Sequence, residues 1–335
     1  MVKSHKKEQV RVGIVGGAGY TGGELIRILI NHPGTTLAFV HSRSHAGKFL
    51  HEIHADLVGE TDAKFSDKFD EADVLFLCVG QGEARKFLEE NAGLLPEAKI
   101  IDLSHDYRLQ HNGKPPMSNG RVFIYGLPEL NKAQIRTAHN IANPGCFATA
   151  IQLGLLPLAK AGLLKEVYTT GITGSTGAGQ SLTPTSHFSW RMNNIQAYKT
   201  LTHQHVKEIT QSLQHLQPSF SPNINFVPWR GDFTRGIFIS SQIHCDRSLE
   251  ELTQLYGDFY RDQPFTILSK EPIFLKQVVN TNKCLIQLEK AGNMLVIHSV
   301  IDNLLKGASG QAVHNMNLLF GMDEKTGLKF KASFF

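Results

Sequence analysis

Hydrophobic runs alternate with amphipathic stretches through the first 140 residues. An apolar run at 10–15 predicts a strand, glycines follow it, and 24–31 carries apolar residues at helical spacing. The same alternation continues with strands expected at 37–40, 73–79, 99–103, 123–125 and 140–142, and a helix at 83–91. Polar residues and Pro115-Pro116 predict an irregular excursion over 105–119. This order predicts an α/β fold that begins with a Rossmann-type doubly wound sheet.

The pattern changes after residue 146 to longer, alternating strands with helices between them. Such a pattern predicts a second, α+β domain with a mixed sheet and helices on one face. Strands are expected at 167–173, 224–228, 236–244, 278–281, 283–288 and 294–300, and helices at 147–161, 207–214 and 249–260. A closing helix at 308–320 is long enough to return to the first domain.

These elements predict two domains with different tasks. A dinucleotide-binding domain is expected over 1–145, with 308–335 returning to it. The segment 146–307 is expected to form the catalytic, substrate-binding and oligomerisation domain.

Composition narrows the class of protein. Of the 335 residues, 41% are hydrophobic and 19% charged, which excludes a disordered, collagenous or coiled-coil chain. The formal net charge of +4 is too small for a nucleic-acid-binding surface, and the basic stretch 3–7 is typical of a solubilising tail. No apolar run approaches the length of a membrane-spanning helix, so we expect a cytoplasmic protein without a membrane partner.

The seven residues that directly follow the first predicted strand indicate a binding function. Glycines in this strand-to-helix context let the backbone approach a pyrophosphate, which indicates a dinucleotide site. Where an acidic residue would bind the ribose of NAD, the second strand is followed by an Arg between two serines, which favours the 2′-phosphate of NADP(H). The residues are Gly16, Gly17, Ala18, Gly19, Tyr20, Thr21 and Gly22, and then Ser42, Arg43 and Ser44.

One of the four cysteines stands out by its position. Cys146 begins the helix predicted after Asn143-Pro144-Gly145, where the helix dipole favours a thiolate. His203 and His205, followed by Glu208, offer a base with a carboxylate to orient it. No Cys-x-x-Cys pair occurs, so neither a redox dithiol nor a metal site is predicted. Pro157 is expected to bend or restart the helix that Cys146 begins.

Several segments together carry a resemblance to a known family. The chain resembles the N-acetyl-gamma-glutamyl-phosphate reductases of arginine biosynthesis, relatives of aspartate-semialdehyde dehydrogenase, from residue 12 to about 328. The most specific segments are the one around Cys146 and the block 302–317, supported by 17–25, 42–44, 102–109, 125–129, the histidine element 203–208 and 234–236.

The resemblance implies a reaction and a set of roles. It implies NADPH-dependent reduction of an N-acyl-gamma-glutamyl phosphate to the semialdehyde with release of phosphate, through a thioester on Cys146. His205 is the expected acid/base, oriented by Glu208, with His203 as the second choice. Substrate-binding roles are implied for Ser104, Asn143, Arg108 and Arg235, and further cofactor contacts for Gly80, Ser175, Gly177, Asn303, Gly310 and Gln311.

Two departures from the family pattern leave the acyl group open. Gln204 stands where the family usually has Arg, and Val227-Pro228-Trp229-Arg230-Gly231-Asp232 replaces a short apolar sequence. The acyl group expected on the substrate is therefore either N-acetyl or N-succinyl. Aspartate-semialdehyde dehydrogenase and, with least support, a non-enzymatic NADP-binding regulator are the rival interpretations. The family forms dimers or tetramers, so a homodimer or homotetramer is expected.

Overall fold

The computed structural model describes residues 9–93, 97–221 and 223–335, which form two compact units. Unit 1 is formed by the chain up to Gly126, by Lys132–Asn143 and by Ala312–Lys329. Unit 2 is formed by Leu127–Asn131, Pro144–Gln311 and Phe330–Phe335. The predicted domains, 1–145 with 308–335 and 146–307, and the division of tasks between them stay a prediction. The basic stretch 3–7 lies outside the described residues.

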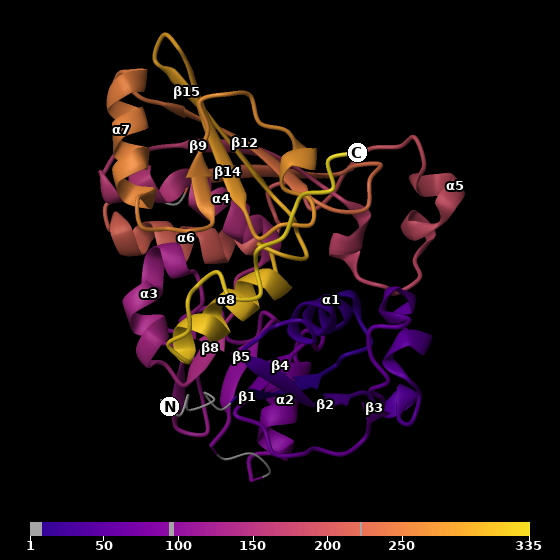
Figure 1. Cartoon of the computed structure of the whole chain (residues 1–335). Helices are drawn as coiled ribbons and strands as arrows, with labels where there is room; N and C mark the ends of the chain where they lie inside the picture. The colour runs from indigo at the N-terminus through magenta and orange to yellow at the C-terminus, as the bar shows by residue number, and fades with distance from the viewer. Residues whose placement is uncertain (1–8, 94–96, 222) are drawn as a thin grey trace, which may run out of the picture. The chain divides into compact units, whose positions relative to one another are not determined.

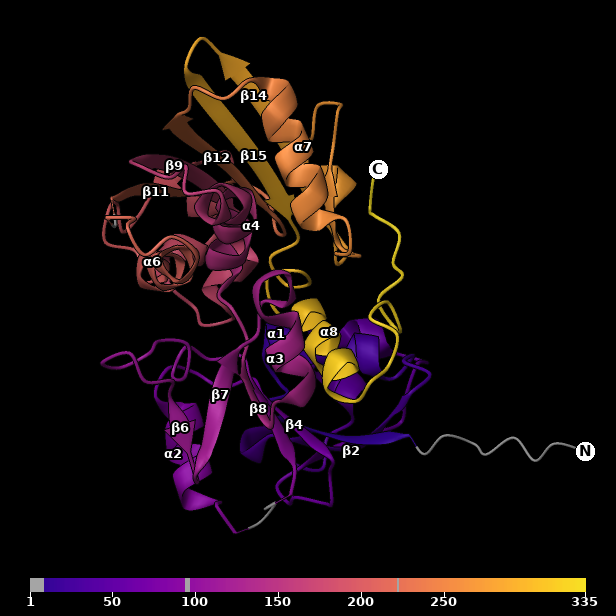
Figure 2. The same cartoon turned by 90° about the vertical axis from the view of Figure 1, so that its left-hand side faces the viewer.

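Unit 1 is built on an eight-stranded sheet in the order β3-β2-β1-β4-β5-β8-β7-β6. Every strand pair is parallel except β6 with β7, and α1 and α2 lie on opposite faces of the sheet (Figures 1 and 2). The predicted Rossmann-type sheet is confirmed. Its strands are β1 (Val10–Val15), β2 (Thr35–His41), β3 (Phe65–Ser66), β4 (Val74–Leu77), β5 (Lys99–Asp102), β6 (Met117–Ser118), β7 (Arg121–Tyr125) and β8 (Asn140–Ala142), and its helices are α1 (Tyr20–Leu29) and α2 (Glu83–Glu90).

Helix α1 begins at Tyr20, four residues before the predicted start. Glycines at 22 and 23 weaken the helical signal in the sequence, because glycine is a poor helix former. Gly22 is nevertheless helical. A glycine is needed at this position because a Cβ there would lie 2.6 Å from the Cα of Gly17 in the preceding turn. A helix that was not predicted, α3 (Pro128–Thr137), is interrupted by the non-helical Asn131.

The closing helix α8 (Ser309–Leu319) belongs to unit 1 from Ala312 onward, as expected for a C-terminal helix that returns to the first domain. Buried amides fix it there. The side-chain amide of Asn315 donates to the carbonyl of Gly126 (2.9 Å) and to Oδ1 of Asn143 (3.1 Å). The last residues, Phe330–Phe335, belong to unit 2, where the amide of Ser333 donates to the carbonyl of Val279 (3.1 Å).

Unit 2 contains a seven-stranded mixed sheet in the order β10-β11-β9-β12-β15-β14-β13. Helices α4, α6 and α7 cover one face of it, as predicted (Figure 2). The strands are β9 (Val167–Thr173), β10 (Gln196–Ala197), β11 (Ile224–Arg230), β12 (Ile237–His244), β13 (Thr266–Leu268), β14 (Cys284–Ala291) and β15 (Met294–Ile301), and the helices are α4 (Cys146–Lys160), α5 (Phe188–Arg191), α6 (His205–Leu216) and α7 (Leu249–Tyr260).

The predicted strand at 278–281 is wrong. A short 3-10 helix, Leu275–Gln277, leads there into a turn in which Asn280 has a φ of +69°. The amide of Asn280 donates to Oδ2 of Asp302 (2.7 Å) instead of joining a sheet. The β-branched residues that suggested a strand therefore lie in a turn held by a distant carboxylate.

Helix α4 runs through Pro157 without ending, so no restart occurs at this proline. A proline has no amide hydrogen, which leaves the carbonyl of Leu153, four residues earlier, without its helical donor. The buried hydroxyl of Tyr260 on α7 donates to this carbonyl. The hydrogen bond that Pro157 removes from the helix of Cys146 is therefore replaced by a side chain of a neighbouring helix.

Candidate active site

The predicted pyrophosphate loop lies at the carboxyl end of β1, and most of its glycines occupy positions where a side chain would not fit or would strain the backbone. Gly16 has a φ of +79°, and a Cβ on Gly17 would lie 2.2 Å from a side-chain carbon of Val40. Gly19, in contrast, faces open space, and no side chain caps the start of α1. His54 supports the loop from behind, with Nε2 2.8 Å from the carbonyl of Gly17. These residues fit a dinucleotide whose phosphates meet backbone amides.

The other predicted cofactor residues of unit 1 follow β2 and β4 at the same edge of the sheet. Arg43 and Ser44 are exposed, and the hydroxyls of Ser42 and Ser44 lie 3.1 and 2.9 Å from Nδ1 of His45. Gly80 donates its amide to the carboxylate of Glu83 (2.9 Å). An exposed guanidinium between two hydroxyls fits a 2′-phosphate.

Three predicted substrate residues of unit 1 lie around the buried carboxylate of Asp102. The amide and hydroxyl of Ser104 both donate to it at 2.9 Å, and burial raises the pKa of Asp102 to about 6. Arg108 donates to the carbonyl of Leu103 (2.8 Å), and Asn143 accepts from Asn315 as described above. These polar side chains are therefore held by the protein itself, and their roles toward substrate stay a prediction.

Cys146 is the first residue of α4 and is half-buried. The backbone of Gly307 passes directly over it, because a Cβ at that glycine would lie 2.8 Å from the Cβ of Cys146 and 2.5 Å from the carbonyl of Asn303. The thiol thus meets the amide end of a 15-residue helix, which favours its ionised form.

Glu208 connects the histidine element to the start of this helix. Its Oε2 accepts the amide of Gly145 (3.1 Å), the residue before Cys146, while its Oε1 lies 3.9 Å from Nε2 of His205. Both His205 and Glu208 are buried on the first turn and a half of α6. One carboxylate therefore holds the start of the helix that begins with Cys146 and also faces a histidine.

His203 has a different environment from His205. Its ring packs edge-on against Phe147 and Phe226, and its Nδ1 accepts the amide of His205 (3.2 Å). Burial, and secondarily the charge of Lys199, lowers the pKa of His203 to about 4. His203 is consequently neutral at pH 7, with one ring nitrogen occupied by a backbone amide.

Arg235 precedes β12 and is paired with Asp302, which follows β15. Its Nε and Nη2 donate to the two carboxylate oxygens of Asp302 at 3.0 and 3.2 Å. The same fully buried carboxylate accepts the amides of Leu304 and Leu305, so it also shapes the loop that leads to Gly307. The predicted role of Arg235 toward substrate stays a prediction.

The predicted cofactor residues of unit 2 lie at this same edge of the sheet or, for Gly310 and Gln311, in the first turn of α8. Asn303 accepts the amide of Gly236 (2.7 Å) and donates to Thr176 (3.0 Å), between the predicted Ser175 and Gly177. Gly310 packs against Asn282, where a Cβ would lie 2.5 Å from its amide oxygen. Gln311 accepts from the buried Lys306 (2.6 Å).

The remaining thiols differ from Cys146. Burial raises the pKa of Cys78 to about 12 and that of Cys284 still further, so both stay protonated. Cys245 is buried beyond the end of β12. Cys146 alone among the four begins a helix.

Sequence reasoning missed three side chains of this region. Burial, and secondarily the electrostatic effect of Cys146, raises the pKa of Tyr198 to about 12. Arg230 stacks over Tyr198, and Arg191 hydrogen-bonds to the backbone of Arg230. Only the unusual run 227–232 marked part of this cluster in the sequence.

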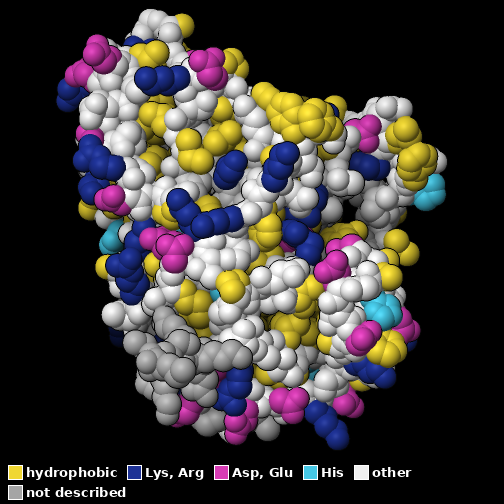
Figure 3. Space-filling model, viewed as in Figure 1, with side chains coloured by type: hydrophobic (Ala, Val, Ile, Leu, Met, Phe, Trp, Pro, Cys, Tyr) yellow, Lys and Arg dark blue, Asp and Glu magenta, His cyan; other side chains and the backbone are white. Residues whose placement is uncertain are grey.

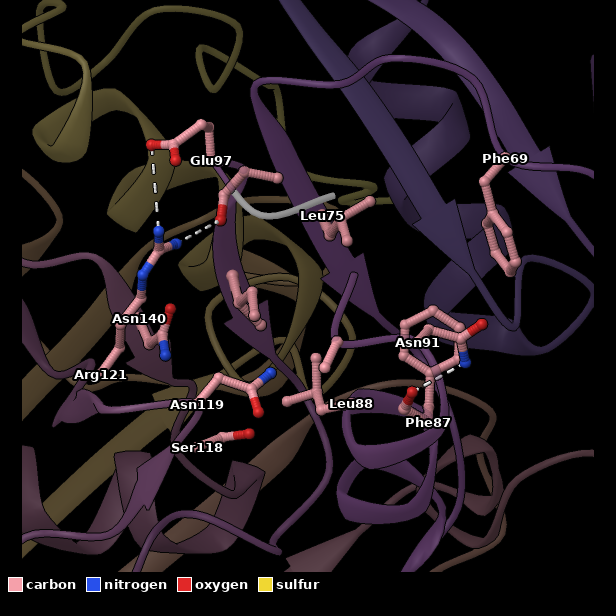
Figure 4. A pocket seen from close by; sticks show the side chains of 13 residues that line it. Phe69, Leu75, Phe87, Leu88, Asn91, Glu97, Ser118, Asn119, Arg121 and Asn140 are labelled. Carbon is pink, nitrogen blue, oxygen red and sulfur yellow. Dashed lines mark hydrogen bonds and ion pairs between the residues drawn. The ribbon is translucent and has the colours of Figure 1, made fainter. Parts of the chain in front are cut away.

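A separate cavity of about 270 Å³ lies in unit 1 (Figure 4). Residues at the amino ends of its strands line it, among them Leu75, Arg121 and Asn140, so it lies at the opposite edge of the sheet from the glycine loop. In the described parts of the chain, no helix has the length and apolar character needed to cross a membrane. No cluster of three metal-ligating side chains occurs within these same residues.

Comparison with known proteins agrees with this geometry. Residues 11–138 match the semialdehyde dehydrogenase NAD-binding domain, and 146–303 match the semialdehyde dehydrogenase dimerisation domain. A solved structure of aspartate semialdehyde dehydrogenase II from Vibrio cholerae covers 94% of this chain and 99% of its own with a TM-score of 0.71 at 17% identity, which shows the fold.

Much higher identity is found among curated proteins. The chain is 54% identical to the N-acetyl-gamma-glutamyl-phosphate reductases of Christiangramia forsetii and Bacteroides thetaiotaomicron, over 97% of this chain and 100% of each relative. The protein of Azobacteroides pseudotrichonymphae with the same name is 55% identical over the same shares. The chain therefore belongs to the N-acetyl-gamma-glutamyl-phosphate reductase family of semialdehyde dehydrogenases.

Proposed function

We propose that this chain catalyses the NADPH-dependent reduction of an N-acyl-gamma-glutamyl phosphate to the corresponding semialdehyde, with release of phosphate. The observation that carries the proposal is the Glu208 carboxylate, which joins the helix start at Cys146 to His205. The names of the 54%-identical relatives support the glutamyl substrate.

The chemistry divides between the thiol and the histidine. The Cys146 thiolate attacks the acyl phosphate carbon, the C–O bond to phosphate breaks, and a thioester forms. NADPH, when bound, supplies the hydride that reduces a thioester to the aldehyde level. His205, faced by Glu208, donates the proton that the departing phosphate takes up, and Cys146 departs as the thiolate when the aldehyde forms. In the reverse direction the same groups carry out phosphate-dependent oxidation of the semialdehyde.

The residues that hold the cofactor follow from the fit described above. Backbone amides at Gly16–Gly22 would meet the pyrophosphate, and Arg43 would meet the 2′-phosphate that distinguishes NADP from NAD.

The nucleophile is tested by Cys146→Ser, with Cys245→Ser as the matched control in the same unit. We expect Cys146→Ser to bind NADPH normally but to lose phosphate-dependent NADP⁺ reduction with N-acetyl-glutamate semialdehyde. Cys245→Ser should keep its activity, because this buried cysteine follows a strand and does not begin a helix. Near-normal turnover by Cys146→Ser would remove the thioester from the mechanism.

The acid/base is tested by comparing His205→Asn with His203→Asn. We assign the proton transfer to His205, because the pKa of about 4 keeps His203 neutral and its Nδ1 already accepts a backbone amide. His205→Asn should slow the chemical step about 10²–10⁴-fold, the range typical of acid/base catalysis, and should alter the pH profile. An unaltered profile would transfer the role to His203.

We also infer a homodimer or homotetramer in the cytoplasm. The face of the unit 2 sheet opposite its helices is partly open, with Tyr168 half exposed, and it lies in the segment that matches a dimerisation domain. Hydrophobic side chains are also exposed around α5, at Leu182, Phe188 and Met192 (Figure 3). None of the four cysteines forms a disulfide, which suits a reducing compartment. Sedimentation equilibrium of the purified chain tests the oligomer, and a monomer at all concentrations would contradict it.

A further inference from the structure

Two arginines lie together at the carboxyl end of β11. Arg230 is the last residue of that strand, and Arg191, the last residue of α5, donates from Nη1 to the carbonyl of Arg230 (3.3 Å). Arg191 also donates from Nη2 to the carbonyl of Thr185 (3.3 Å) and is only 9% exposed. The guanidinium of Arg230 stacks 4.8 Å from the ring centre of Tyr198. The two cations therefore share one partly buried place.

No carboxylate neutralises this pair. Across residues 9–93, 97–221 and 223–335, neither guanidinium has an acidic group within the 4.0 Å of an ion pair, and the Nε atoms of both are buried without an acceptor. Asp232 acts on Arg191 only from a distance, since it is exposed and its Oδ2 accepts the amide of Asn193 (2.6 Å). Burial and the charge of Arg230 lower the pKa of Arg191, so keeping its guanidinium charged in the folded protein costs free energy.

The sheet places this pair beside the nucleophile. Arg230 is in register with Thr173 at the end of β9, where the Ser175–Ala178 loop follows. Tyr198, on which Arg230 stacks, interacts electrostatically with Cys146 and lies edge-on to the ring of His203. The other arginine at this edge, Arg235, already faces the carboxylate of Asp302. Arg191 and Arg230 are thus the cations here whose charge the protein leaves uncompensated.

We propose that Arg191 and Arg230 form an anion subsite of the Cys146 site that binds a carboxylate of the acyl-phosphate substrate. The inference rests on the proposed function and adds the substrate group that is recognised. A guanidinium presents its N–H groups as a planar fork that matches a carboxylate. The carboxylate comes either from the glutamyl α-carbon or from the end of an N-acyl chain such as succinyl. Arg230 also lies within the run 227–232 that departs from the family pattern.

The subsite is tested by Arg230→Gln in the reverse reaction, with N-acetyl- or N-succinyl-glutamate semialdehyde, inorganic phosphate and NADP⁺ varied in turn. We expect the KM for the semialdehyde to rise roughly 10- to 100-fold, with the KM values for phosphate and NADP⁺ unchanged, because only a charge-assisted contact to the carboxylate is lost. Arg230→Lys keeps the charge without the fork and should show a smaller rise. Arg247→Gln, which alters an exposed arginine paired with Glu251 on α7, is the matched control and should change nothing.

Two further arms separate the alternatives. If Arg230→Gln raises the KM for phosphate or NADP⁺ instead, or leaves all KM values unchanged with both N-acetyl- and N-succinyl-glutamate semialdehyde in a folded protein of normal melting temperature, the carboxylate subsite is refuted. Comparing N-acetyl- and N-succinyl-glutamate semialdehyde identifies the source. Equal losses with both indicate the α-carboxylate, and a wild-type preference for N-succinyl that the variant abolishes indicates the acyl chain. A wild-type enzyme without phosphate-dependent activity on either compound would contradict the proposed function itself, whereas an active wild type isolates the subsite.

Discussion

The contact between Tyr260 and helix α4 makes a quantitative prediction about the helix that carries Cys146. In Tyr260→Phe the ring remains, and only the hydroxyl that donates to the carbonyl of Leu153 is lost. Because Pro157 supplies no amide hydrogen, this carbonyl then has no donor in a fully buried part of the helix. Leaving a buried polar group unpaired costs about 1–3 kcal/mol, so Tyr260→Phe should destabilise the protein by about 2 kcal/mol.

The proline is what makes this hydroxyl necessary, and a double-mutant cycle measures that dependence. In a Pro157→Ala background the new amide donates to the carbonyl of Leu153, so Tyr260→Phe should cost only about 0.5–1 kcal/mol there. The two substitutions should therefore be coupled by about 1–1.5 kcal/mol.

Tyr256 provides the matched control one turn earlier on α7. Its hydroxyl donates to the carbonyl of Gly154 (2.6 Å), which the α-helical pattern also supplies with the amide of Leu158. Tyr256→Phe should cost less than Tyr260→Phe and should couple to Pro157→Ala by less than about 0.5 kcal/mol. Urea unfolding followed by far-UV circular dichroism, at one fixed protein concentration, measures all six proteins. Equal coupling for both tyrosines would refute the link between the proline and the hydroxyl.

Three further predictions concern the site and its supports. Gly307→Ala should lower kcat at least about tenfold, because its Cβ would lie 2.8 Å from that of Cys146, whereas Gly257→Ala on α7, which meets open space, should leave kcat unchanged; similar rates for both would contradict the close approach. Burial raises the pKa of Asp102 from 3.8 to about 6, so its contribution to stability is present below pH 4 and is lost as the pH rises through 6. Relative to Asp102→Asn, the wild type should lose about 2 kcal/mol between pH 4 and 7 in urea unfolding, and parallel pH curves would count against this. Arg43→Ala should raise the KM for NADPH at least about tenfold more than that for NADH in initial-rate assays, and equal changes would argue against a 2′-phosphate contact.

Local pattern was sufficient for most of the fold, and its failures have tertiary causes. Strand 10–15 and helix 249–260 were predicted at their observed limits, because each has an uninterrupted period and a clear start or stop. The strand expected at 278–281 failed because Asp302 and Ser333, distant in sequence, take the backbone groups of this turn. The continuity of α4 through Pro157 could not be predicted either, since the compensating hydroxyl lies 107 residues away along the chain.

For the site, the sequence predicted which residues to consider better than it predicted the contacts between them. The thiol at a helix start was predicted from Cys146 and the turn before it, and the structure places it there. The difference between His203 and His205 was left open, because it depends on ring packing and on one backbone amide that no spacing encodes. The contact of Glu208 with Gly145 was likewise invisible, since it joins α6 to the start of α4.

The partners of the arginines show why the net charge of a site cannot be predicted from the order of residues in the sequence. Ile237 and Ile301 are in register in the antiparallel pair β12 and β15, so the residues just outside this pair, Arg235 and Asp302, come to the same edge of the sheet and neutralise each other. Arg230 reaches that edge through a different pair, β11 with β9, and no acidic residue follows Thr173 there. The family resemblance implies a substrate-binding role for Arg235. The strand register, however, places the carboxylate of Asp302 beside its guanidinium. The uncompensated charge lies on Arg191 and Arg230, and a substrate that carries a carboxylate would therefore gain more from these two side chains than from Arg235.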